Sequence, residues 1–414
     1  MIADALPLYL ADVKTVRPPS HTPKSGTVFA GVGGRALLML KLHAATGQAA
    51  YLSKAKEYTD AMLNLLPKQR LVDAATGAVG FQWSHVGMLC VASVATSRTG
   101  NEKAAKHYAQ AVADVFEAAA DSRAGKYDDF DSGRAGLLYA CRFLEANLPP
   151  QLVSSLFPRS SVLRLATSIV DRGSATGRAH GNDYLQWHGP NDGGLWLGQS
   201  HGSAGVLQML LEVPELLTNA TAAGWIQRTL DHTCDVQQSS GNFPTEYYNA
   251  TQDWLVQWDH GAPGVSAALL RGWRAFGTPR YLASALKALD VVWQRGLLLK
   301  GLMNCHGIGG NVWMMLYASQ QLAEAARDLE QDKQAAFYYR EQADRQLYRA
   351  LQFEHTVLSH PLLSDLKQMR QPQPLPDAPW LFWTGSVESA IELWTDLLYR
   401  GPGNASMTGW AAAL

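Results

Sequence analysis

Three short loops carry titratable side chains directly before a glycine. They read Ser200-His201-Gly202, Asp259-His260-Gly261 and Cys305-His306-Gly307. Carboxylate, thiolate and imidazole groups are all zinc ligands, and three protein ligands with one open position are typical of a catalytic zinc rather than a structural one. If the fold brings the last two loops together, Asp259, Cys305 and His306 supply an oxygen, a sulfur and a nitrogen to one ion.

A site of this composition would act on a thiol. A free thiol has a pKa of about 8.5 and is only a few per cent thiolate at neutral pH. A zinc-bound thiol, by contrast, is deprotonated and still nucleophilic. The open position would therefore hold a substrate sulfur. The residues alone leave an alternative open, in which Cys305 is a small buried hydrophobic residue and His306 a hydrogen-bonded core histidine.

The glycine loop recurs along the chain, each time before an apolar helical pattern. Seven copies can be read: FAGVGG (29–34), WSHVG (83–87), DSGRAG (131–136), SHGSAG (200–205), DHGAPG (259–264), CHGIGG (305–310) and a weaker WTGSVES (383–389). The spacing leaves room for two helices per copy. Seven such helical hairpins predict an all-α fold, an (α/α)7 toroid with its glycine loops at one end. An open solenoid is the alternative, although it would need polar capping repeats at both ends.

Apolar residues at steps of three and four predict individual helices. They are expected over 36–46, 51–66, 103–120, 281–298 and 323–351. Two stretches break the pattern and are expected to be long loops, 171–200 and 354–382. The second contains five prolines and is interpreted as a rim or lid loop, or equally as a surface excursion without a role.

The composition narrows the class of protein. The 414 residues include 35 Lys and Arg against 36 Asp and Glu, a formal net charge of −1, which argues against a nucleic-acid groove. Four cysteines without a CxxC pair fit a reducing compartment. No run of 18 apolar residues is present, and the first residues lack a basic segment followed by an apolar one. We therefore expect a cytoplasmic protein without a transmembrane segment, and a monomer.

The loop sequences together resemble the lanthionine synthetase C-like family, and its eukaryotic branch most closely. The similarity lies in WDHGAPGVSAAL, NCHGIGGN, SHGSAGVL and SGNFP, with FAGVGG and SGRAGLLYA in family order. The resemblance implies one domain over 1–414, an α/α toroid, and a zinc ion held by two cysteines and a histidine. Bacterial members cyclise lanthipeptides by adding a cysteine thiol to dehydroalanine or dehydrobutyrine. The similar eukaryotic enzymes bind glutathione and add it to dehydroamino acids in proteins.

The resemblance also implies roles for single residues. Cys305 and His306 match the family's adjacent zinc ligands. The other matches are His201 for the catalytic histidine that moves a proton, His260 for a residue near the active centre, Asp129 for an active-site aspartate, and Lys300 for a basic residue of the glutathione site.

The sequence departs from the family pattern at the first zinc ligand, where Asp259 replaces a cysteine. A carboxylate is an acceptable zinc ligand, and the exchange keeps the −1 charge while reducing ligand softness. The resulting Asp/Cys/His set resembles that of protein prenyltransferases, another α/α toroid that activates thiols. Gln252 stands where the family has an arginine, and the last glycine motif has become GSVES.

These observations predict zinc-dependent addition of glutathione or a peptide cysteine to a dehydroamino acid in a peptide or protein. Two alternatives remain at this point. The chain could be a non-catalytic scaffold that binds zinc or glutathione, because the ligand set has changed. It could also be a carbohydrate-active α/α toroid, although such an enzyme needs a close carboxylate pair.

Overall fold

The computed structural model describes residues 1–15, 26–66, 77–190, 193–249, 251–329, 331–360 and 386–401. Within this part of the chain the backbone forms helices and loops, with one isolated antiparallel bridge between Trp196 and Glu246. No described helix combines the length and apolar character that a membrane span requires. The chain divides into two compact units. Unit 1 consists of Met1–Arg17, Gln237–Pro244 and Thr251–Trp410, and unit 2 of Pro18–Val236, Thr245–Ala250 and Ala411–Leu414.

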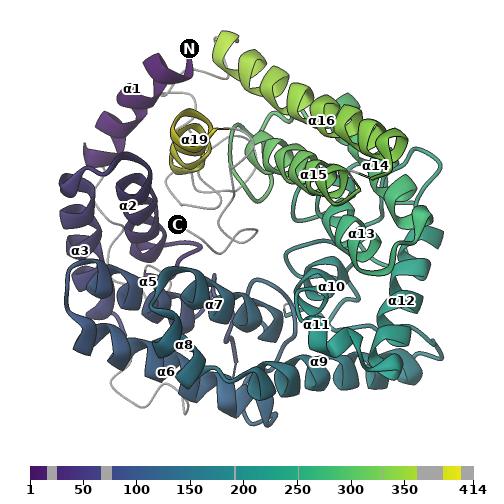
Figure 1. Ribbon diagram of the computed structural model, residues 1–414, viewed down its shortest axis with the longest axis horizontal. Coiled ribbons are helices and arrows are strands. Elements are labelled where there is room, and N and C mark those ends of the chain that lie inside the picture. Colours follow the sequence, from purple (N-terminus) through teal and green to yellow (C-terminus); the bar gives the residue numbers. More distant parts are fainter. Residues whose placement is uncertain are drawn as a thin grey trace. The chain divides into compact units, whose positions relative to one another are not determined.

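Unit 2 is a series of helices that pack in pairs (Figure 1). The pairs are α2 (Val32–Thr46) with α3 (Ala49–Leu63), α5 (His85–Arg98) with α6 (Glu102–Ala120), and α7 (Arg134–Asn147) with α9 (Arg159–Ala179), the short α8 (Pro150–Leu156) lying between the last two in the chain. The unit continues with α10 (Ser203–Leu211), α11 (Pro214–Leu217) and α12 (Ala220–Asp235). Helix α10 packs on α7, and α12 packs on α9.

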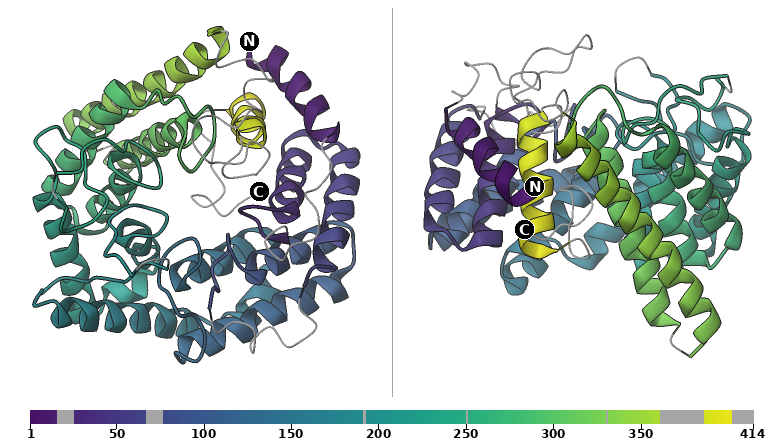
Figure 2. Two further views of the ribbon diagram at one scale, coloured as in Figure 1. Left: turned by 180° about the vertical axis from the view of Figure 1, so that it is seen from behind. Right: turned by 90° about the horizontal axis from the view of Figure 1, so that it is seen from above.

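Unit 1 contains two further pairs. They are α13 (Ala262–Phe276) with α14 (Pro279–Arg295), and α15 (Ile308–Asp328) with α16 (Lys333–Ser359). Helices α15 and α16, in light green, lie side by side in the right-hand view of Figure 2. Helix α19 (Ser386–Thr395) continues into the π-helical turn η2 (Asp396–Arg400). Its partner comes from the other end of the chain: α19 packs on α1 (Ile2–Thr15), where the rings of Tyr9 and Trp394 meet edge to face with centroids 4.6 Å apart.

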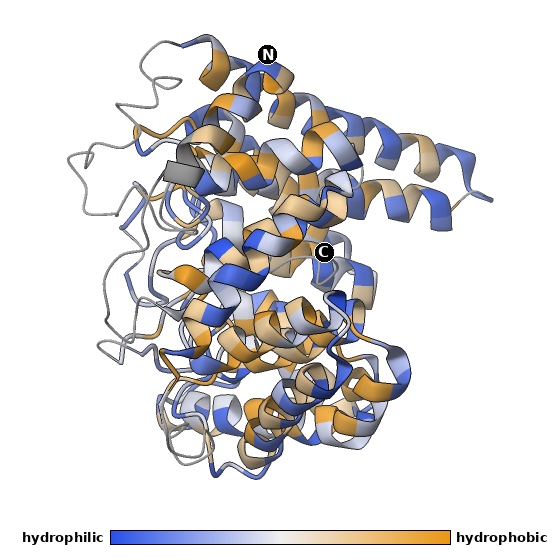
Figure 3. Cartoon of the chain, turned by 90° about the vertical axis from the view of Figure 1, so that its left-hand side faces the viewer, coloured by the Kyte–Doolittle hydropathy of each residue, from blue (hydrophilic) through white to orange (hydrophobic). Residues whose placement is uncertain are grey.

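The first helix of a pair is more deeply buried than the second. Every residue of α10 is buried, and most residues of α2 and α5 are, whereas in α3 burial is confined to Ala55, Tyr58, Thr59 and Met62. The second helices are amphipathic, with one apolar face on the partner helix. Figure 3 shows this mixture of hydrophobic and hydrophilic residues along the helices. The loops before the first helices are therefore held by the core.

The glycine loops start the helices that the repeat predicts. Gly31, Gly133, Gly202, Gly261 and Gly307 are N-cap residues, and Ser84 takes this position in the second copy. The seventh glycine, Gly385, lies outside the described residues, and α19 begins directly after it.

In four motifs the glycine in the first helical turn, at 87, 136, 205 and 310, allows a close backbone contact. At Gly205 and at Gly310 an added Cβ would overlap the carbonyl oxygen of the residue three positions before the cap, Gln199 and Asn304 respectively. The loop folds back onto the first helical turn only because no side chain stands there. This contact determines where the residues between the loop carbonyl and the cap are placed.

Four of the expected helices are confirmed as α2, α3, α6 and α14, although α3 and α14 end three residues earlier than expected, at Leu63 and Arg295. One prediction is wrong. The single helix expected over 323–351 is two helices, because Asp332 caps α16 by accepting a hydrogen bond from the main-chain nitrogen of Ala335 (3.0 Å). The polar loops are also shorter than expected. Helix α9 extends to Ala179, and α16 extends to Ser359, whereas residues 361–382 of the proline-rich stretch lie outside the described residues.

Candidate metal centre

Asp259, Cys305 and His306 lie together in unit 1. Their ligand atoms are all within 4.8 Å of one another. The closest pair is His306 Nε2 and Asp259 Oδ2, at 2.9 Å. Asp259 and Cys305 are buried, and His306 is partly exposed. The two loops that were predicted to share one ion are thus neighbours.

Main-chain and side-chain hydrogen bonds hold these two loops together. The nitrogen of Asp259 donates to the carbonyl oxygen of Cys305 (3.1 Å). Asn311 on α15 donates its side-chain amide to the carbonyls of Val256 (2.9 Å) and Gly296 (3.0 Å), which lie in the segments leading to Asp259 and to Cys305. The ligand positions are therefore set by the backbone before any ion binds.

Helix α19 supports the cysteine loop through Asn304. The main-chain nitrogen of Asn304 donates to Ser389 Oγ (3.2 Å), and its side-chain amide donates to Glu392 Oε2 (2.9 Å). All three residues are buried. Although its glycine motif is weak, the seventh repeat thus contributes to the site through the helix that follows it.

His260 lies beside the same carboxylate oxygen. Its Nε2 atom is 3.2 Å from Asp259 Oδ2, which is also the oxygen that faces His306. A buried carboxylate that faces a thiol and two imidazoles is a donor set for a divalent metal, and an Asp, Cys, His set suits zinc. Zinc bonds of about 2.0–2.3 Å require separations of roughly 3–4 Å between ligand atoms, so the three side chains fit such an ion with small adjustments.

A second polar cluster surrounds His201 in unit 2. His201 Nδ1 lies 3.2 Å from Asp129 Oδ2, so the structure brings these two sequence candidates together, and their catalytic roles stay predictions. The same carboxylate accepts hydrogen bonds from the main-chain nitrogen of Ser132 (2.9 Å) and from its hydroxyl. Asp129 is buried, and the side chain of His201 keeps 21% of its surface exposed. Asp129 can therefore orient a histidine that still reaches solvent.

Two residues of this cluster were not predicted from the sequence. Ser200 donates its hydroxyl to Asp131 Oδ2, and both residues are fully buried. Asp131 Oδ2 also lies 3.9 Å from His201 Nε2. Both residues stand two positions before a helix-capping glycine, the position of Asp259 and Cys305, and this shared position is the signal that could have identified them.

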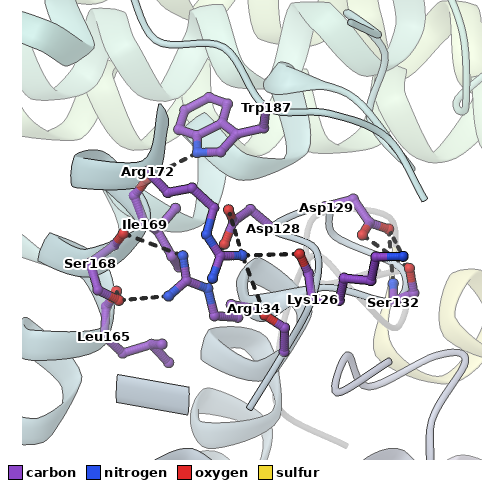
Figure 4. Close-up of polar contacts among 11 residues, drawn as sticks. Lys126, Asp128, Asp129, Ser132, Arg134, Leu165, Ser168, Ile169, Arg172 and Trp187 are labelled. Carbon is purple, nitrogen blue, oxygen red and sulfur yellow. Dashed lines mark hydrogen bonds and ion pairs between the residues drawn. The ribbon is translucent and has the colours of Figure 1, made fainter. Parts of the chain in front are cut away.

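A buried ion pair anchors the loop that carries Asp129. Arg134 Nε donates to Asp128 Oδ1 (2.6 Å), and Arg172 lies 3.3 Å from the other carboxylate oxygen, as Figure 4 shows. Arg134 also donates to Ser168 Oγ (2.9 Å) on α9. Burial raises the pKa of the Asp128 carboxyl, and the positive charge of Arg134 opposes this effect. The pair ties the loop to α9.

Comparison with known proteins identifies the family. The sequence profile described as "Lanthionine synthetase C-like protein" matches residues 22–360. The chain belongs to the lanthionine synthetase C-like family. It is 26% identical over 299 residues to "Glutathione S-transferase LANCL1" of Danio rerio, which covers 71% of this chain and 70% of that protein. It is 28% identical over 305 residues to "LanC-like protein GCL1" of Arabidopsis thaliana, which covers 70% of this chain and 65% of that protein.

A solved structure gives the fold of this lanthionine synthetase C-like chain. "Nisin cyclase" superposes with a TM-score of 0.57 over 96% of this chain and 98% of that chain, at 13% sequence identity. The likeness is one of fold, and it confirms the predicted all-α fold class, that of the helical toroid. The predicted eukaryotic resemblance is confirmed by the two plant and animal relatives.

The other residues that the sequence analysis singled out lie in loops of the lanthionine synthetase C-like chain or in its core. Lys300 lies partly buried in the loop between α14 and Cys305, and its assignment to a glutathione site stays a prediction. Gln252, which replaces the expected arginine, precedes an aspartate that pairs with an arginine from α14: Asp253 Oδ1 and Arg295 are 2.9 Å apart. The other cysteines are core residues, and burial raises the pKa of the Cys90 and Cys141 thiols.

Proposed function

We propose that this protein adds a thiol, glutathione or a peptide cysteine, across the double bond of a dehydroamino acid in a peptide or protein. The observation that carries the proposal is the convergence of Asp259, Cys305 and His306 within 4.8 Å in a member of the lanthionine synthetase C-like family. The similarity to a protein named glutathione S-transferase favours glutathione as the thiol. In this reaction the sulfur bonds to the β-carbon and a proton is added at the α-carbon, so that no group leaves.

The metal-binding residues are Asp259, Cys305 and His306. A zinc ion held by these side chains would make a thiolate available at neutral pH, because it would lower the pKa of a thiol bound to it. The protein contributes a preformed set of a buried carboxylate, a buried thiol and a partly exposed imidazole. His260, at 3.2 Å from Asp259 Oδ2, restricts where that carboxylate can point.

His201 is proposed to move the proton. If its Nδ1–H donates to Asp129, the proton is fixed on Nδ1 and Nε2 becomes the atom that accepts or donates a proton. Asp129 is itself held by Ser132, so the ring has a defined orientation. General acid–base catalysis by a positioned histidine contributes about 10²–10⁴-fold in rate.

The test combines metal content and adduct formation. The purified protein, loaded with zinc, is incubated with glutathione and a dehydroalanine-containing peptide, and the adduct is measured by mass spectrometry. We expect adduct above the uncatalysed background, its loss together with zinc in Cys305→Ala, and an about 10²–10⁴-fold slower reaction with zinc retained in His201→Ala. Cys90→Ala, a buried cysteine outside the site, is the matched control. No adduct from the zinc-loaded wild type would favour the alternative of a non-catalytic zinc or glutathione-binding scaffold.

A further inference from the structure

The glycine loops are joined in pairs by the same main-chain hydrogen bond. In each case the nitrogen of the residue two positions before one helix cap donates to the carbonyl oxygen of the residue at the same position before the next cap. We name this the bridge position. The donor and acceptor residues are Phe29 and Gln82 (3.0 Å), Asp131 and Ser200 (3.2 Å), and Asp259 and Cys305 (3.1 Å).

The second and the third of these bonded pairs carry corresponding side chains. Asp259 and Cys305 in unit 1 correspond to Asp131 and Ser200 in unit 2, and the histidine that follows Cys305 corresponds to the one that follows Ser200. The backbone environment is also the same, because the loops of Ser200 and Cys305 make the same close carbonyl contact with the glycine in the first helical turn. The correspondence therefore rests on main-chain geometry as well as on residue types.

The two sets differ in one atom type. In unit 1 the three groups offer oxygen, sulfur and nitrogen. In unit 2 the sulfur is replaced by the hydroxyl of Ser200, which donates to Asp131 Oδ2. Cysteine, histidine and carboxylate side chains are the usual zinc ligands, and a serine hydroxyl is not among them. A hydroxyl can instead join the two loops by a hydrogen bond to the carboxylate.

We infer that Asp131, Ser200 and His201 form a second copy of the metal-ligand set, in which the Ser200–Asp131 hydrogen bond joins the loops in place of an ion. Asp131 and Ser200 are then positioning residues: they hold the loop on which His201 is presented. The inference also makes Ser200 the residue that keeps this particular set of side chains from binding a metal ion. It builds on the metal centre proposed for unit 1, but its test separates the two.

The test creates a metal site in unit 2 by one substitution and removes the metal site of unit 1 by another. Ser200→Cys completes an aspartate, cysteine and histidine set in unit 2, and Cys305→Ser removes the thiolate from unit 1. Zinc bound per chain is measured by elemental analysis after exhaustive dialysis. We expect one zinc in the wild type, two in Ser200→Cys, none in Cys305→Ser and one in the double variant. Ser203→Cys, which places a thiol at a buried serine three residues further along, is the control and should leave the count at one.

The outcomes separate the two proposals. If the wild type binds no zinc and Ser200→Cys binds one, the metal centre of unit 1 fails and the inference stands. A folded Ser200→Cys variant with the wild-type zinc count overturns the inference. Cobalt(II) in place of zinc gives a second measurement: a thiolate-to-cobalt absorption band that is present in the double variant and absent from Cys305→Ser must arise from the new cysteine, because the other three cysteines are common to both.

A further measurement does not depend on the folding of Ser200→Cys. Under chelating conditions the Cys305→Ser variant should form in unit 1 the hydroxyl–carboxylate bond that Ser200 and Asp131 form in unit 2, whereas Cys305→Ala cannot. We expect the metal-free Cys305→Ser variant to melt about 2–4 °C above metal-free Cys305→Ala. Equal melting temperatures would show that the bridge position in unit 1 is not the equivalent of the one in unit 2.

Discussion

Glu354 makes the stability of this protein depend on pH in an unusual direction. The side chain lies on α16, is buried, and accepts a hydrogen bond from Trp394 Nε1 on α19 at 2.5 Å. Burial raises the pKa of the Glu354 carboxyl from its ordinary 4.5 to about 7, and the hydrogen bond from Trp394 opposes this rise. The folded protein therefore keeps a proton on Glu354 at pH values at which the unfolded chain has released it.

The sign and size of the effect follow from proton linkage. Between pH 4.5 and about pH 7 the folded state binds one more proton at this site than the unfolded state. The free energy of unfolding therefore falls as the pH rises through this interval and levels off above pH 7. At 1.36 kcal/mol per pH unit, the site removes about 3 kcal/mol between the two limits.

The Glu354→Gln variant isolates this contribution. A glutamine carbonyl still accepts the hydrogen bond from Trp394 but carries no titrating proton. We expect the free energy of unfolding of the variant, measured by urea denaturation from pH 4 to pH 8, to gain about 3 kcal/mol relative to wild type across the range. Glu341→Gln, an exposed site on the same helix, is the control and should follow the wild-type curve. A constant difference between Glu354→Gln and wild type would refute the reasoning.

Further predictions concern the elements around the two sites. Gly310→Ala should lower the free energy of unfolding by about 1–3 kcal/mol, because the new Cβ overlaps a loop carbonyl; Gly77→Ala, where the Cβ meets no neighbour, should change it by less than about 0.5 kcal/mol in the same urea titration. Arg134→Met should lower the free energy of unfolding by about 3 kcal/mol, because it removes the buried charged partner of Asp128 and leaves that carboxylate only the contact with Arg172; adding Asp128→Asn should restore part of the loss in calorimetry. Tyr9→Ala should lower the free energy of unfolding by about 3 kcal/mol, because it opens a cavity against α19. Thermal unfolding measures this loss, and an unchanged stability would contradict the packing of α1 on α19.

Most of the helices, and the meeting of Asp259, Cys305 and His306, could be predicted because their signals are local. The glycine motif marks a helix start by the backbone contact that it permits. Asp259 and Cys305 stand at the same position, two residues before their caps, and this repetition predicts that the two side chains meet. The Asp332 cap was missed because the apolar spacing continues through it, and a single capping side chain ended one helix and began the next. Two glycines near the end of α9 gave the false signal of a loop. Gly173 lies against the ring of Trp187, and Gly177 against the carbonyl of Tyr184, so they serve close packing.

The polar cluster around His201 shows a different limit of prediction from the sequence. Asp131 and Ser200 are 69 residues apart and belong to residue types that are common at protein surfaces. Nothing in their local sequence distinguishes a buried hydrogen-bonded pair from two solvated side chains. Only the alignment of the glycine loops at one position reveals that they occupy the positions that correspond to Asp259 and Cys305. The hydrogen bonds from Asn304 to α19 could not be predicted either, because their partners, Ser389 and Glu392, lie more than 80 positions further along the chain.

The partnership of α1 with α19 has a consequence for how the chain acquires its structure. A ribosome makes α1 long before α19, so the ring of Tyr9 has no partner helix while the whole of unit 2 is synthesised. Contacts between such distant segments are slow to form, and exposed apolar surface attracts chaperones or aggregates in the meantime. A nascent chain stalled before residue 386 would hold unit 1 open, with its earliest helix still unpaired.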